Sequence, residues 1–131
     1  MTKIIDGKNA TLGRLASYAA KECLNGESVV ILNCDKIIIT GNKKDIRENF
    51  GKKRERVGSA QKGPKISRSI DKIVKRAIRG MLPNHRTGRG REALKRIRCY
   101  KDIPKEFEGK EKIISGKRKT TKFIEIKEML K

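Results

Sequence analysis

The segment from Gly7 to Gly13 has the glycines and the position of a phosphate-binding loop, because it follows a predicted strand and precedes a predicted helix. A P-loop needs G-x-x-x-x-G-K-[ST], in which the lysine neutralises phosphate and the hydroxyl binds magnesium. Here Arg14-Leu15 follows the second glycine, and the dinucleotide pattern G-x-G-x-x-G is absent. We therefore predict no nucleotide cofactor, although the helix N-terminus could still meet a phosphate of a larger polyanion.

His85 is the only histidine in the chain, and it lies in a basic loop between Asn84 and Arg86. No serine or cysteine near it has a recognisable nucleophile context, and no carboxylate pair is evident. Contact with RNA or exposure to solvent is the expected role of His85. We predict that the protein is not an enzyme, with no catalytic residue and no small-molecule substrate.

The three cysteines, Cys23, Cys34 and Cys99, are widely spaced. None belongs to a C-x-x-C pair, and one histidine does not complete a zinc site, so we predict no metal and no other cofactor. Each cysteine lies in an apolar or alternating segment. We expect three small buried side chains in a reducing cytoplasm.

Positive charge is the strongest feature of the composition. The formal net charge is +20, and the stretch from Lys52 to Lys101 holds eighteen lysines and arginines against three acidic residues. Arginine dominates the centre of this stretch, and glycines separate the charges, so the backbone can approach a phosphate surface closely. Such a concentrated field predicts binding of a polyanion, most commonly a nucleic acid.

The kind of nucleic acid follows from what the basic stretch lacks. The chain has five aromatic residues, Tyr18, Phe50, Tyr100, Phe107 and Phe123. None lies in the loop 86–91, which argues against a stacking platform for single strands. No recognition-helix or zinc-finger pattern points to sequence-specific DNA binding. We therefore predict recognition of the shape and backbone of folded RNA.

The length of 131 residues favours one domain, although 38% of the residues are charged and only 35% are hydrophobic. The apolar residues are clustered and periodic, which indicates a folded centre with basic loop extensions. We expect a basic arm at about 51–65 and an irregular basic C-terminal segment at about 104–120. No apolar run reaches the roughly 20 residues of a membrane span, and no secretory signal pattern is present, so we expect a cytoplasmic protein without a membrane partner.

The first forty residues predict a β-α-β unit. A short strand at 3–5 precedes a helix whose apolar residues recur at helical spacing from Leu12 to Cys23, with Asn9 or Thr11 as its N-cap. The nearly continuous apolar run at 28–33 is typical of a strand that is buried on both faces. This order favours parallel strands joined by a right-handed crossover.

The remaining predicted elements are shorter. In order they are a β-rich segment at 36–40, a helix at 43–50, an extended basic loop beyond Gly51, an amphipathic helix with Ile66, Ile70, Ile73, Ala77 and Ile78 on its apolar face, a polar loop at 84–90, a helix at 92–96, a strand at 97–100, a strand at 122–124 and a helical turn at 125–130. Together they predict an α/β protein, a three-layer α/β/α fold with a small, mostly parallel four-stranded sheet.

Several motifs resemble those of one family in the same order. They are Ile5-Asp6-Gly7, the segments from Leu12 to Ser17 and from Asn33 to Asn42, Arg79-Gly80-Met81-Leu82-Pro83, the segment from Arg89 to Ile97 and the segment from Tyr100 to Pro104. On these motifs the chain resembles the large-subunit ribosomal protein uL13 (L13) family over nearly its whole length. The basic region ending in Gly63-Pro64, and an end without the long extension of eukaryotic forms, resemble the archaeal type.

The resemblance implies a single L13-like domain over residues 1–131 and a structural role in the large ribosomal subunit. It also implies large-subunit rRNA and neighbouring ribosomal proteins as partners. The residues that we predict to bind rRNA combine positive charge with a place in the basic stretch. They are Lys52, Lys53, Arg54, Arg56, Lys62, Lys65, Arg68, Arg76, Arg79, His85, Arg86, Arg89, Arg91 and Arg96.

Two other functions stay open at this point. One is an RNA-binding regulator of translation that acts off the ribosome, which the charge pattern alone does not separate from a ribosomal role. The other is a nucleotide-dependent enzyme that uses the turn at 6–13. The absence of Lys-Ser/Thr after Gly13 counts against this second function.

Overall fold

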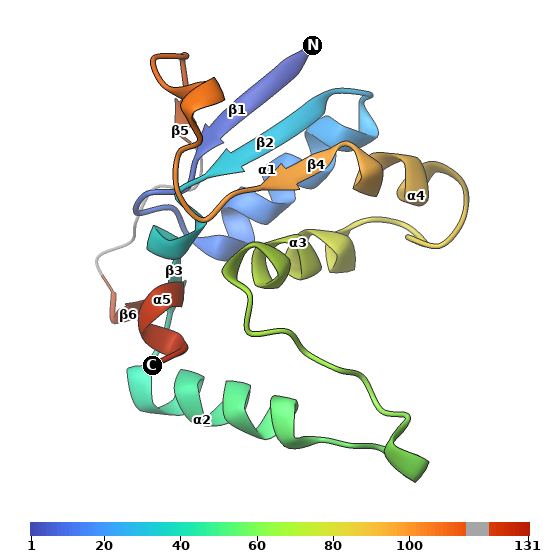
Figure 1. Ribbon diagram of the computed structural model, residues 1–131, viewed down its shortest axis with the longest axis vertical. Coiled ribbons are helices and arrows are strands. Elements are labelled where there is room, and N and C mark those ends of the chain that lie inside the picture. The colour runs from blue at the N-terminus through green and yellow to red at the C-terminus, as the bar shows by residue number, and fades with distance from the viewer. Residues whose placement is uncertain (115–120) are drawn as a thin grey trace.

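A parallel four-stranded sheet lies at the centre of the computed structural model, which describes residues 1–114 and 121–131 (Figure 1). Its strands are β1 (Thr2–Asp6), β2 (Ser28–Leu32), β4 (Ile97–Cys99) and β5 (Ile113–Ile114), in the spatial order β4-β2-β1-β5. Each neighbouring pair is parallel. The predicted α/β class and the small parallel sheet are confirmed.

The predicted β-α-β unit forms as expected. α1 (Leu12–Leu24) connects β1 to β2, and the two strands pair with Ile4 opposite Val30. Thr11 is the N-cap residue, but its side chain makes no capping hydrogen bond. The strand predicted at 97–100 is also confirmed, because β4 pairs with β2 on the side away from β1.

Alternating side chains of β1 and β2 build two separate hydrophobic clusters. Ile5 and Ile31 belong to the larger cluster, which they share with α1, α3 (Ile70–Met81) and α4 (Gly88–Lys95). Ile4 and Val30 belong to the smaller cluster, which Phe107 of the 3-10 turn η3 (Lys105–Phe107) completes. The three layers are therefore unequal, with helices on one face of the sheet and a short turn on the other (Figure 1).

The segment that forms the fourth strand of the main sheet differs from the prediction. The strands predicted at 36–40 and 122–124 form as β3 (Ile38–Thr40) and β6 (Phe123–Glu125), but they pair with each other as a separate antiparallel sheet. The fourth strand of the main sheet is instead β5, inside the segment that we predicted to be irregular. A strand of two residues is too short for an alternating pattern to reveal it. Residues 115–120 of that predicted segment lie outside the described residues.

The helix predicted at 43–50 is longer than expected. α2 spans Lys43–Glu55, so the first part of the predicted extended loop is helical. α2 buries no residue, and therefore no apolar periodicity marks its second half. Local interactions support it instead: Asn42 Oδ1 accepts a hydrogen bond of 3.2 Å from the Lys44 amide, and Lys52 pairs with Glu48 one turn away.

Two further helix boundaries differ from the prediction. α3 begins at Ile70, so Ile66 lies before it, and its fully buried residues are Val74 and Ile78. α4 begins at Gly88, inside the predicted polar loop, and α5 (Ile126–Met129) forms the predicted terminal turn. In the sequence the glycines of α4 indicated a loop, whereas Gly90 serves close packing. Its added Cβ would lie 2.3 Å from the Pro83 carbonyl oxygen.

Candidate nucleic-acid interface

The predicted basic residues lie at three places in the fold. The arm at 51–65 carries Lys52, Lys53, Arg54, Arg56, Lys62 and Lys65, and Arg68 follows it just before α3. α3 itself carries Arg76 and Arg79. The turn before α4, α4 and the residue that ends it carry His85, Arg86, Arg89, Arg91 and Arg96.

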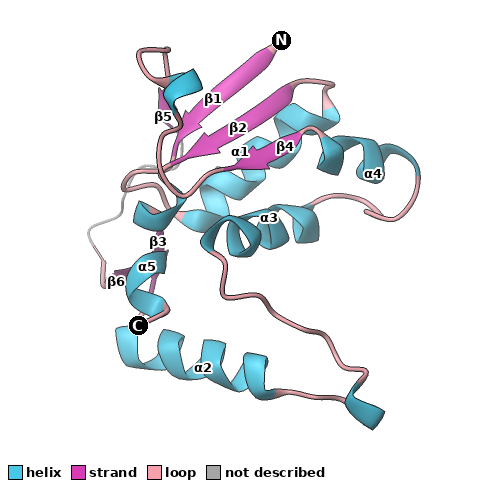
Figure 2. Cartoon of the chain, viewed as in Figure 1, coloured by secondary structure: helices cyan, strands magenta, loops and turns pink. Residues whose placement is uncertain are grey.

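The arm consists of the last turns of α2 and a loop that projects below α3 (Figure 2). Every residue from 52 to 62 is exposed. The tip is nevertheless closed, because the Gly63 amide donates a hydrogen bond of 2.9 Å to the Val57 carbonyl oxygen. Gly58 has a φ of 68°, and an added Cβ would lie 2.5 Å from the Gly63 Cα, so only glycine fits there. The tip of the arm therefore has a defined backbone conformation, although residues 52–62 are all exposed.

α3 carries basic residues on a helix whose inner side is buried in the core. Val74 and Ile78 are both 0% exposed, and they pack in the same cluster as α1 and Ile97 of β4. Basic residues lie around this buried stripe, with Lys72 and Arg76 exposed on the outer side of the helix. The positions of these charges are therefore set by the packing of the domain.

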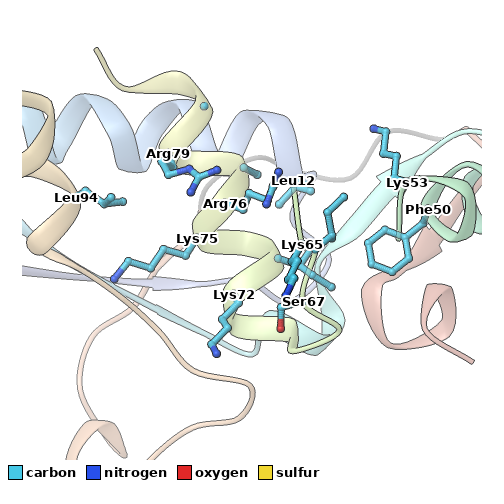
Figure 3. A pocket seen from close by; sticks show the side chains of 14 residues that line it. Leu12, Phe50, Lys53, Lys65, Ser67, Lys72, Lys75, Arg76, Arg79 and Leu94 are labelled. Carbon is cyan, nitrogen blue, oxygen red and sulfur yellow. The ribbon is translucent and has the colours of Figure 1, made fainter. Parts of the chain in front are cut away.

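A groove with a volume of about 640 Å³ opens between α2, the segment 65–67 and α3, and we call it the basic groove (Figure 3). Its apolar lining residues are Leu12, Phe50, Ile66, Ile73, Ala77 and Leu94. Its basic lining residues are Lys53, Lys65, Lys72, Lys75, Arg76 and Arg79. Among residues 1–114 and 121–131, no acidic residue lines it. The groove therefore combines an apolar floor with a strongly positive rim.

The basic groove unites two of the three predicted places. Lys53 and Lys65 of the arm lie there with Arg76 and Arg79 of α3, whereas the charges of α4 and the turn before it lie elsewhere. The structure adds Lys72 and Lys75, which we had not predicted as binding residues. Their helical spacing relative to Arg76 and Arg79 was the signal that could have identified them.

Phe50 is the aromatic residue of the groove that sequence reasoning missed. We looked for aromatic residues inside the loop 86–91 and found none, so we argued against a stacking platform. Phe50 instead reaches the groove from α2 and is partly buried against the core. No local pattern predicts this position, because an exposed loop separates α2 from α3 in the sequence.

The turn before α4 is organised by Asn84. Its Oδ1 accepts a hydrogen bond of 3.1 Å from the Arg86 amide, and its Nδ2 donates one of 3.1 Å to Thr87 Oγ1. This turn leads into α4, so Arg89 and Arg91 lie in a helix rather than in the predicted loop. Both side chains are exposed, as is Arg86.

The arginine side chains are not neutralised by the protein itself. Within residues 1–114 and 121–131, no arginine has a carboxylate oxygen within 4.0 Å, since each ion pair there uses a lysine or the N-terminus. An arginine without a carboxylate keeps its full charge and its planar set of donors for an external anion. The surface is therefore suited to binding phosphate groups.

Two of the predicted binding residues already have partners inside the domain. Arg96 Nη1 donates a hydrogen bond of 3.1 Å to the Cys23 carbonyl oxygen near the end of α1. Arg68 Nη2 donates one of 2.8 Å to the Leu130 carbonyl oxygen. Each guanidinium therefore holds a C-terminal helix end, a structural role that the sequence did not indicate. Their binding of rRNA stays a prediction.

The glycine that resembled part of a phosphate loop has a structural explanation. The Gly7 amide donates a hydrogen bond of 2.9 Å to the Leu32 carbonyl oxygen, so it is not available to a phosphate. An added Cβ on Gly7 would lie 2.8 Å from both that oxygen and Ile37 Cγ1. Close packing at the ends of β1 and β2 therefore explains why glycine occupies this position, and no nucleotide site is needed to explain it.

The cysteines do not form a reactive site. Cys23 and Cys34 are buried as predicted, whereas Cys99 is only half-buried. Burial raises the pKa of the Cys23 thiol to about 11, and a hydrogen bond with Cys99 together with burial raises the pKa of Cys34. Both buried thiols stay protonated at neutral pH and are poor nucleophiles.

Two further features were sought in the described part of the chain, a cluster of metal ligands and a membrane-spanning helix. No three His, Cys, Asp or Glu side chains gather there to hold a metal ion. None of its helices is both long and apolar enough to cross a membrane.

The fold and its surface define an α/β protein whose exposed charges suit a polyanion. A family model described as "Ribosomal protein L13" matches residues 1–106. The large ribosomal subunit protein uL13 of Picrophilus torridus is 45% identical over 130 residues, which cover 97% of this chain and 93% of the relative. The uL13 of Methanocaldococcus jannaschii is 44% identical over 131 residues, with 98% and 94% covered.

A third relative agrees with the first two. The uL13 of Archaeoglobus fulgidus is 39% identical over 132 residues, which cover 96% of this chain and 83% of the relative. The chain therefore belongs to the L13 family of ribosomal proteins. The resemblance that its motifs indicated, including the archaeal type, is confirmed.

Proposed function

We propose that the chain is a structural component of the large ribosomal subunit that binds and stabilises folded rRNA in the cytoplasm. The observation that carries the proposal is a set of exposed arginines without carboxylate partners, on a domain that belongs to the L13 family. The names of the relatives place those proteins in the large subunit. Neighbouring ribosomal proteins are its other partners, and its role includes no catalytic step.

In the proposed mechanism, the helices α3 and α4 and the projecting arm bind rRNA in different ways. α3 and α4 hold arginines in positions fixed by the core, so they fit one arrangement of phosphates. The arm reaches beyond the domain and contributes further charge from Lys52 to Lys65. Neutralising phosphates from separate RNA segments lowers their mutual repulsion, which stabilises the packing of those segments.

Salt dependence tests the binding mechanism. If the protein neutralises about 6–10 phosphates, its affinity for rRNA should fall by roughly 10³–10⁵ between 50 and 200 mM salt. A filter-binding titration of the full chain against large-subunit rRNA measures this fall. Replacing Arg86, Arg89 and Arg91 with alanine should weaken binding and leave thermal unfolding nearly unchanged. Weak salt dependence in the native protein would contradict the mechanism.

Sedimentation tests the cellular role. The proposal requires the native protein to co-sediment with large subunits, also after a high-salt wash. A protein found only in the light fractions, bound to other RNA, would instead support a regulator that acts off the ribosome. The two outcomes share RNA binding and differ only in the particle that contains the protein.

A further inference from the structure

The basic groove differs from the other charged surfaces in having an apolar floor. Phosphates and sugars of a regular RNA helix would satisfy the rim, but they offer nothing apolar to cover Phe50, Leu12 and Ile73. These three side chains are partly buried and pack against the main core, so the floor is a fixed part of the domain. Its occupant must therefore bring an apolar face together with negative charge.

We propose that the basic groove binds an unpaired nucleotide of rRNA, with its base against the apolar floor and its neighbouring phosphates on the rim. The inference rests on the proposed function, since it names the part of the RNA that this site recognises. Charge complementarity selects this occupant, because the described lining of the groove has six basic residues and no acidic one. An apolar segment of a neighbouring protein would leave those six charges without partners.

The groove carries two kinds of flat side-chain group, a phenyl ring and guanidinium groups. Figure 3 shows Phe50 on the side of α2 and Arg76 and Arg79 on the side of α3, with Lys65 between them. A base can stack on a phenyl ring or on an arginine guanidinium plane. Stacking on an aromatic residue contributes about 1–3 kcal/mol per base and works with any base. The groove therefore predicts recognition of an unstacked base without strong preference for its identity.

The dimensions of the groove also suit one nucleotide. Its volume of about 640 Å³ lies within the range of roughly 300–1,000 Å³ that is usual for small-ligand sites. Lys53 and Lys65 border the groove on the arm side, and Lys72 borders it on the side of α3. A bulged or looped nucleotide thus has cations on both sides, one for each flanking phosphate.

The first experiment compares Phe50→Leu with the native protein in binding to large-subunit rRNA. Leucine keeps an apolar side chain in the floor but lacks the flat ring, so affinity should fall roughly 5- to 100-fold. The dependence of affinity on salt should stay unchanged, because no charge is removed. Phe50→Tyr keeps the ring and should bind as the native protein does. Phe123→Leu, outside the groove, is the matched control and should bind normally.

The second experiment maps the contact directly. Large-subunit rRNA containing 4-thiouridine is crosslinked to the native protein by ultraviolet light, and the crosslinked peptides are identified by mass spectrometry. Peptides with residues 50–53 or 65–80 should dominate. The same crosslinking within assembled large subunits shows whether rRNA or a neighbouring protein occupies the groove.

The outcomes separate this inference from the proposed function. Steep salt dependence, with normal binding by Phe50→Leu and crosslinks outside the groove, would overturn the inference and leave rRNA binding intact. Crosslinks from the groove to a neighbouring protein in the assembled subunit would also overturn it. Loss of salt-dependent rRNA binding in the native protein would overturn both proposals together.

Discussion

α3 has four basic residues and the arm has six, and the two regions differ in how the fold supports them. α3 has Val74 and Ile78 fully buried beneath its charged faces, whereas every residue from 52 to 62 in the arm is exposed. The core thus fixes the backbone that bears the basic residues of α3. It does not fix the loop of the arm, so we expect RNA binding there to cost more conformational entropy. Apolar spacing, and not charge, decides which basic residues are pre-positioned.

The largest expected effect tests the anchor of α3. Ile78→Ala should lower the free energy of unfolding by about 2–5 kcal/mol, because it removes a fully buried side chain from the main core. Val57→Ala in the arm removes a side chain that is 64% exposed and should change it by less than about 0.5 kcal/mol. Urea denaturation measures both. Equal losses in the two variants would mean that the arm is as well anchored as α3.

The next largest effect compares charges on the two regions. Replacing Lys72, Arg76 and Arg79 with alanine should weaken rRNA binding about 100-fold at low salt, and replacing Arg54, Arg56 and Lys62 should weaken it less. Both triple variants should reduce the slope of log affinity against log salt by about 2–3, since each removes three charges. Salt titrations of the two variants measure this. A greater loss in the arm variant would reverse the proposed ranking.

A smaller difference in the free energy of unfolding is expected between variants of Arg96, which bonds to the backbone of α1, and of Arg98, which is exposed. Arg96→Ala removes the hydrogen bond to the Cys23 carbonyl oxygen and should lower the free energy of unfolding by about 1–2 kcal/mol. Arg98→Ala, at an exposed position on β4, should change it by less than about 0.5 kcal/mol. Thermal and urea denaturation compare the pair. An unchanged Arg96→Ala protein would show that this contact does not support the fold.

The smallest effect concerns the helix that bears the arm. Asn42→Ala removes the N-cap of α2, which should destabilise that helix by about 1 kcal/mol. Because α2 buries no residue, global unfolding should barely change. Hydrogen exchange should show roughly fivefold faster exchange of the α2 amides, with α3 unaffected. Protection of α2 equal to that in the native protein would show that its packing on α5 is sufficient without the cap.

Elements with long or strongly periodic apolar patterns could be predicted from the sequence. The run of β2 and the spacing in α1 predicted both elements, since their burial dictates their composition. β5 could not be predicted, because two residues make no pattern. The true end of α2 was missed for a related reason, since Lys52 to Glu55 are helical without burying anything.

The candidate interface was predictable in composition but not in shape. The clustering of arginines indicated where the charge lies along the chain. The basic groove depends on the tertiary structure, because Phe50 of α2 and Ile73 of α3 are far apart in the sequence and line it together. Its apolar floor is therefore visible only in the folded structure. The same holds for Arg96, whose partner Cys23 lies 73 residues earlier.

The pairing of β3 with β6 has a consequence for how the protein is made. Strand β6 begins at Phe123, so β3 gains its pairing with β6 only after residues 123–125 have been synthesised. α2 depends on the same late segment, since Arg47 Nε donates a hydrogen bond of 3.2 Å to the Glu128 carbonyl oxygen and Lys43 pairs with the Glu128 carboxylate. β1, α1 and β2 can assemble early from the N-terminal residues. The nascent chain thus acquires its folded centre first, and α2 gains its contacts with residue 128 only afterwards.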